Sequence, residues 1–138
     1  MEQLSSGIEN QDYTFEPLEE VLGKFGLTIG GNWEYDHAYF DYLLDQTDEK
    51  YTHLRIPVNA EIGQIGEKDA HVRIGKPFVL SHQFEAGIDQ QGDSGNFQAS
   101  INQFASPVNP DAEIEARLIT RAEEVLLEVE KFLLSNRF

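Results

Sequence analysis

The sequence predicts an α+β fold in which an antiparallel sheet packs against two helices, one near each end of the chain. Apolar residues recur at helical spacing in a short N-terminal segment and in a long C-terminal segment. Between them, apolar and polar residues alternate in runs that turns, not helices, separate. Strands that follow one another in this way exclude parallel βαβ units, so we expect an antiparallel sheet of about four to six strands.

Length and composition indicate one folded domain. The chain has 138 residues, a length typical of a single domain, so we expect one domain over residues 1–138. Hydrophobic residues make up 40% and aromatic residues 11% of the chain, which is enough to build a core. The absence of cysteine excludes disulfides, thiol nucleophiles and thiolate metal sites.

The first expected element is a helix over residues 17–25, approximately. Pro17 suits the first helical position, and Gly26 suits a left-handed cap that ends the helix. Its apolar stripe is Leu18, Val21, Leu22 and Phe25.

A long strand is expected next, over residues 32–44. Trp33, Tyr35, His37 and Tyr39 share one parity, whereas Phe40, Tyr42 and Leu44 share the other. A strand with one buried face cannot bury both sets without a bulge near residues 38–40, and the alternative is a strand covered on both faces.

Three more strands and two turns follow. After a hairpin connection at 45–50, residues 51–58 place Thr52, Leu54, Ile56 and Val58 on one face, and Pro57 indicates a sheet edge. After a turn at 63–69, residues 72–80 form a strand broken at 75–77. A loop at 85–96 and a half-buried strand at 97–104 complete the sheet.

The last element is a long helix over residues 110–135, approximately. Asn109, Pro110 and Asp111 form a typical helix start, with an amide cap, proline first and an acid next. The apolar stripe contains Ile114, Leu118, Ala122, Val125, Val129 and Phe132.

The charge is strongly negative and unevenly distributed. Ten basic residues against 25 acidic ones give a net charge of −15, which argues against binding to nucleic acid or to anionic membranes. Residues 1–50 hold twelve acids and two bases, whereas residues 51–82 are nearly neutral and carry three of the four histidines.

This nearly neutral region contains the candidate binding residues. If the segments around residues 53 and 71 pair, two histidines and two arginines lie on one face, where they suit a carboxylate or phosphate ligand. We favour the alternative, in which the arginines neutralise acids on neighbouring strands. The candidate set adds aromatic and amide side chains, and comprises Trp33, Tyr35, His53, Arg55, His71, Arg73, His82, Asn102 and Gln103.

No catalytic motif is present, so the first functional hypothesis is a non-catalytic domain that binds a small molecule or a protein. We expect no cofactor and no metal site. The second hypothesis is an enzyme that uses acid–base groups: Glu34, Asp36 or Asp41 with His37 or His82. It requires a cleft that holds a carboxylate and a histidine about 3 Å apart.

A third hypothesis is an acidic interaction protein, or a mimic of nucleic acid, that is steered to a basic partner by its N-terminal charge. Homodimer formation would cover the exposed sheet edges. Residues 1–10 lack the apolar segment of a secretory signal, and no run of about 18 apolar residues occurs, so we expect a cytoplasmic protein without a membrane span.

The chain also resembles a known family through two sets of residues. The first comprises Gly31, Trp33–His37, Tyr39–Tyr42 and Leu54–Val58; the second comprises Val72–Gly75, Pro77–His82, Asn102–Phe104 and Pro107. Together they resemble the YugN-like proteins of Bacillus and its relatives. The resemblance implies a small cytoplasmic protein of one domain without an assigned activity, and it identifies no catalytic residues.

Overall fold

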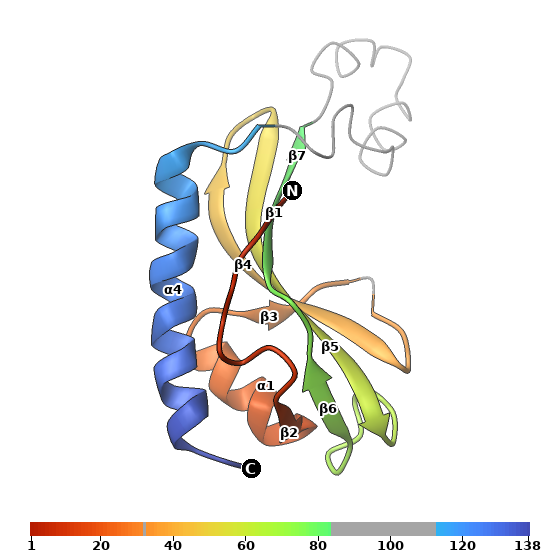
Figure 1. Ribbon diagram of the computed structural model, residues 1–138. Helices are drawn as coiled ribbons and strands as arrows, with labels where there is room; N and C mark the ends of the chain where they lie inside the picture. Colours follow the sequence, from red (N-terminus) through yellow and green to blue (C-terminus); the bar gives the residue numbers. More distant parts are fainter. Residues whose placement is uncertain (32, 84–112) are drawn as a thin grey trace, which may run out of the picture.

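The computed structural model describes residues 1–31, 33–83 and 113–138, and it confirms the α+β class. One sheet lies against two helices that share a single hydrophobic core (Figure 1). The elements in chain order are β1 (Glu2–Gln3), β2 (Asp12–Thr14), α1 (Phe15–Lys24), β3 (Thr28–Ile29), β4 (His37–Gln46), β5 (Lys50–Ile62), β6 (His71–Ile74), β7 (Phe78–Gln83) and α4 (Ala116–Ser135).

All strand pairings among the described residues are antiparallel, and the sheet is organised around β5. The seven described strands run in the order β1-β7-β5-β4-β3, with β6 beside β5 and β2 beside β6. The first half of β5 pairs with β7 and the second half with β6, while β4 runs along its other side. Three of the seven strands have only two or three residues, which explains why the sequence indicated fewer.

The core lies between the sheet and the helices. Alternation in β5 is as predicted, because Thr52, Leu54, Ile56 and Val58 are all buried on the helix side. Leu18 and Leu22 of α1 and five residues of α4 close this core from the other side. At the C-terminal end, the buried hydroxyl of Tyr13 donates to the Leu133 carbonyl at 2.9 Å.

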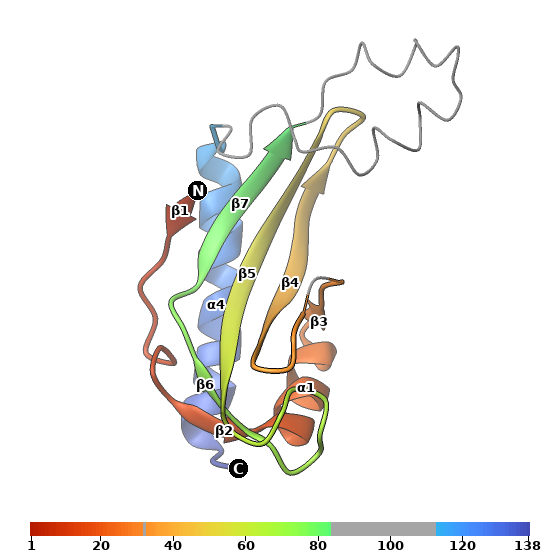
Figure 2. The same cartoon turned by 90° about the vertical axis from the view of Figure 1, so that its right-hand side faces the viewer.

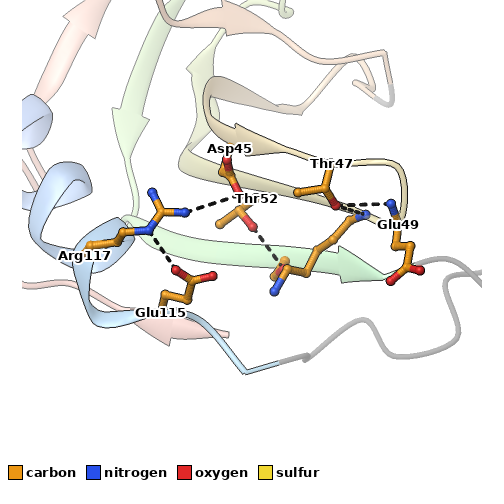
Figure 3. A network of polar contacts seen from close by, with 8 residues as sticks. Asp45, Thr47, Glu49, Thr52, Glu115 and Arg117 are labelled. Carbon is orange, nitrogen blue, oxygen red and sulfur yellow. Dashed lines mark hydrogen bonds and ion pairs between the residues drawn. The ribbon is translucent and has the colours of Figure 1, made fainter.

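The long helix begins later than the sequence indicated. It starts at Ala116, and the described residues before it, 113–115, are not helical. The proposed cap at Asn109 lies outside the described residues. Figure 3 shows how Arg117 ties this helix start to the sheet, since its Nε is 2.7 Å from the Glu115 carboxylate and its Nη2 is 3.8 Å from Asp45.

The predicted strand at 32–44 was wrong in its first part. Trp33–Asp36 precede β4, and Glu34 forms an isolated bridge with His37 that closes a tight turn. Pairing with β5 is regular at residues 38–40, and the irregularity lies between Leu43 and Asp45 instead. Because Trp33 and Tyr35 belong to a turn, they do not share a strand face with Tyr39.

Pro57 was also wrongly taken as the mark of a sheet edge. It lies in the central strand β5, opposite Tyr39 of β4, and its carbonyl accepts a hydrogen bond from the Gly75 N–H at 2.8 Å. In an antiparallel strand the amide nitrogen and the carbonyl of a residue point to the same side. The missing N–H of Pro57 therefore faces residues 75–77, where β6 has ended and β7 has not begun.

Some of the remaining predictions concern described residues, and the others concern residues outside them. The hairpin at 45–50 is confirmed, with the Thr47 side chain accepting from the N–H groups of Glu49 and Lys50 (Figure 3). The break at 75–77 is confirmed by the gap between β6 and β7. The predicted loop 85–96 and strand 97–104 lie outside the described residues. Within the described chain, neither helix is both long and apolar enough to cross a membrane.

Candidate functional site

The face of the sheet that points away from α4 is not covered by either described helix (Figure 2). Residue pairing across β4, β5 and β7 arranges its side chains in three rows. We call these three rows of side chains the outer-face patch. The first row is Asp41, Arg55 and Phe78, the second is Leu43, His53 and Leu80, and the third is Gln46, Tyr51 and His82.

The patch is aromatic and aliphatic in character. Tyr39 borders it, with its ring centroid 6.4 Å from that of Phe78 and 4.9 Å from the guanidinium carbon of Arg55. Leu43, in the middle row, leaves 48% of its surface exposed. A sheet face of this composition is unusual for one that meets only water, because outward strand positions are usually polar.

The charges in the patch neutralise each other. Arg55 donates from Nε and Nη2 to the two carboxylate oxygens of Asp41 at 2.8 and 3.1 Å, directly across from β5 to β4. The Asp41 side chain is only 14% exposed, so this ion pair is largely shielded from solvent. The patch is therefore close to neutral on a protein whose total charge is −15.

His53 occupies the centre of the patch, between Leu43 and Leu80. Its Nδ1 is buried and has no hydrogen-bond partner among the described residues. Burial lowers the pKa of His53, and the neighbouring Asp41 carboxylate opposes this effect. A neutral imidazole with an unsatisfied buried nitrogen is energetically unfavourable, so a rotation of the ring that turns this nitrogen toward a hydrogen-bond partner would be stabilising.

We expect acid to destabilise the protein through His53. Its pKa in the folded protein lies below the value of 6.5 assigned to the unfolded chain, so the unfolded state binds more protons as the pH falls below 6.5. The contribution of neutral His53 to stability is thus complete above 6.5 and is lost as the pH falls from there toward the folded pKa. Urea unfolding at about pH 7.5 and about pH 5.5 should show a weaker pH dependence for His53→Gln than for the wild type. An equal dependence would contradict this assignment.

The other two basic candidates share this face but lie farther along the sheet. Arg73 of β6 stands opposite Asn59 of β5, and it donates to both oxygens of Asp12 at 2.7 and 3.0 Å. The hydrogen bond from Arg73 holds the pKa of Asp12 below its usual value. His71 is exposed opposite Ile62. Both arginines therefore neutralise acids across strands, as the favoured alternative predicted.

The remaining candidates are dispersed. His82 and Tyr51 pair at one end of the patch. Trp33 and Tyr35 lie in the exposed turn before β4, away from these rows. Asn102 and Gln103 lie outside the described residues.

Among the described residues, one contact between a carboxylate and a histidine has the length that the acid–base hypothesis requires. The Asp36 carboxylate lies 2.9 Å from His37 Nδ1, but both side chains are well exposed and the two residues are adjacent in one turn. Asp41, in contrast, is held by Arg55. Ligand atoms of Glu34, Asp36 and His37 lie within 4.8 Å of one another, an arrangement that exposed acidic groups often have without a metal.

Two cavities lined by described residues lie on the helix side of the sheet, and no histidine is among these lining residues. The larger, about 940 Å³, is open and lies beside the start of α4, with Lys50, Gln83 and Ile119 in its wall. The smaller, about 400 Å³, lies between Phe25, Tyr42 and Arg121. Neither cavity brings together the carboxylate and histidine that acid–base catalysis requires.

Sequence reasoning missed the aliphatic part of the patch. The spacing of Phe78 and Leu80 is typical of the buried side of a strand, but Val79 and Ser81 are the buried residues of β7. The available signal was the apolar character of both parities in 78–80, which indicates a strand with two partly covered faces.

Comparisons with known proteins agree with this fold. A family model described as the YugN-like family matches residues 3–133. Uncharacterized protein YugN of Bacillus subtilis (strain 168) is 43% identical over 131 residues, 95% of this chain and 97% of that protein. Uncharacterized protein YlbA of the same strain is 25% identical over 96 residues, 70% of this chain and 78% of that protein. The crystal structure of uncharacterized conserved protein YugN from Geobacillus kaustophilus HTA426 has a TM-score of 0.74 and 17% identity, covering 98% of this chain and 97% of that one.

Proposed function

Since this chain belongs to the YugN-like family, whose relatives described above carry no assigned function, we propose its role from its surface: it is a non-catalytic, single-domain binding protein. Its outer-face patch docks a protein partner. The observation that carries the proposal is the central row of Leu43, His53 and Leu80, in which a buried ring nitrogen lacks a hydrogen-bond partner among the described residues.

A protein is the partner that this surface fits best. The patch extends over three strands, whereas the two cavities described above lie on the opposite side of the sheet. Protein interfaces have apolar centres depleted in charge and enriched in aromatic residues. The neutral Asp41–Arg55 pair and the neighbouring Tyr39 and Phe78 match that description.

The proposal places the protein in the cytoplasm. A cysteine-free chain that folds without disulfides is compatible with a reducing compartment.

The proposal is tested with Leu43→Asp, which puts a charge in the middle row of the patch. Its matched control is Leu127→Asp on α4, since the two leucines are exposed to 48% and 49%. A partner captured with the wild-type protein is purified and titrated against all three proteins by calorimetry. We expect the affinity of Leu43→Asp for the partner to be at least about tenfold lower than that of the wild type. The affinity of Leu127→Asp should stay within about threefold of the wild type.

Two other outcomes would change the assignment. Purified partners that bind Leu43→Asp as tightly as the wild type would exclude the patch as the docking surface. A metabolite that raises the melting temperature of the wild type and the Leu127→Asp control, but not of Leu43→Asp, would assign the patch to a small molecule. Sedimentation of the same three proteins shows whether a second copy of the chain is the partner.

A further inference from the structure

A second surface lies at the end of the sheet where β5 and β6 are connected, apart from the outer-face patch. Backbone hydrogen bonds hold the turn before β4 against this end. The N–H of Ala60 donates to the Asp36 carbonyl at 2.9 Å, and the N–H of Ile65 donates to the Tyr35 carbonyl at 2.7 Å. Residues 33–37 and 61–69 thus form one unit, which we call the tip; both segments lie at the same end of the sheet in Figures 1 and 2.

The tip exposes three large hydrophobic side chains. Trp33, Tyr35 and Ile62 expose 48%, 63% and 64% of their surfaces. Tryptophan and tyrosine are enriched among the residues that contribute most to protein binding energy. The tip therefore has the composition of a docking surface.

The charge of the tip is strongly negative. Its two segments contain five carboxylates and one lysine, and Glu34 and Asp36 alternate with the two aromatic residues along the turn. Within the described chain, only one of these carboxylates, Glu61, lies within ion-pair distance of an arginine or a lysine, at 3.9 Å from Arg73. Aromatic faces and carboxylates together suit guanidinium and ammonium groups, which stack on the rings and pair with the acids.

We propose that the tip binds an arginine- or lysine-rich segment of a protein partner through stacking on Trp33 and Tyr35 and pairing with Glu34 and Asp36. These four residues lie outside the three rows of the outer-face patch. The two surfaces adjoin at Tyr39, whose ring centroid lies 6.3 Å from that of His37.

The chain itself supplies the probe for a test. Trp33 is its single tryptophan, so the intrinsic tryptophan emission of the full protein reports on the tip alone. The ligand is a short peptide of alternating arginine and glycine. We expect it to shift or quench Trp33 emission to saturation, with an affinity that falls as salt is added because salt screens exposed charges.

Three double variants separate recognition by the tip from general attraction to an acidic protein, with affinities measured from the anisotropy of the labelled peptide. E34Q/D36N removes the acids of the tip and W33A/Y35A removes its rings without changing the charge. E19Q/E20Q is the matched control, because it removes two exposed carboxylates from α1, outside the two segments of the tip. We expect the affinity of each tip variant for the peptide to be at least about tenfold lower than that of the wild type. The affinity of the control should stay within about threefold of the wild type.

Circular dichroism confirms that each variant is folded. The proposal is overturned if E19Q/E20Q weakens binding as much as E34Q/D36N, since only total charge would then matter. It is equally overturned if W33A/Y35A binds like the wild type, or if saturating peptide leaves Trp33 emission unchanged.

Discussion

Replacing Phe40 with alanine is expected to lower the free energy of unfolding by about 3–5 kcal/mol. The ring is fully buried, its centroid lies 6.3 Å from that of Phe15 at the start of α1, and its strand neighbours are Ile29 and Ile56. Truncation leaves a cavity where the sheet meets this helix. Because domains are stable by only about 5–15 kcal/mol, the variant should unfold at a much lower urea concentration.

Leu43→Ala is the matched control for this prediction. Leu43 lies on the same strand, three residues away, but half of its surface is exposed. We expect it to change the free energy of unfolding by less than about 1 kcal/mol. If urea unfolding showed similar losses for both variants, Phe40 would not have the core position described here.

Breaking the ion pair between Arg55 and Asp41 is expected to have the second largest effect. Arg55→Ala should lower the free energy of unfolding by about 2 kcal/mol, because the Asp41 carboxylate then stays largely buried without its two charged hydrogen bonds. The second arginine–aspartate pair provides a natural comparison. Arg73 and Asp12 have nearly the same two-bond geometry, but both side chains are about half exposed.

Because solvent screens exposed ion pairs, Arg73→Ala should change stability far less than Arg55→Ala. Double-mutant cycles with Asp41→Asn and Asp12→Asn, measured by urea unfolding, isolate the coupling in each pair. Equal coupling energies in the two cycles would show that burial does not determine the strength of these pairs.

In β5, the structural feature that depends on residues close in the sequence was predicted correctly, whereas the feature that depends on distant segments was not. The alternation of Thr52, Leu54, Ile56 and Val58 predicted their burial correctly, because strand geometry alone sends alternate side chains to one face. Pro57 led to a wrong prediction of a sheet edge, because the effect of its missing N–H depends on what lies beside it in the sheet. Beside Pro57 lies the break between β6 and β7, which is distant in sequence.

The candidate site shows the same division. The cross-strand pairing of Arg55 and Arg73 with acids was favoured from composition, since an acidic chain offers many carboxylates. Which acids pair with them depended on register, which placed Asp41 opposite Arg55 and Asp12 opposite Arg73. Trp33 and Tyr35 alternated like strand residues, but the bridge between Glu34 and His37 placed them in a turn.

By itself, the sequence determined the α+β class, the two helices, the alternation within the central strand and the resemblance to the YugN-like family. These features follow from local periodicity and from motifs of adjacent residues. Only the tertiary structure decided that Leu43, His53 and Leu80 form one row and that Trp33 and Tyr35 project from the tip. Such neighbours are set by strand pairing and by backbone hydrogen bonds between distant segments, which local periodicity does not encode.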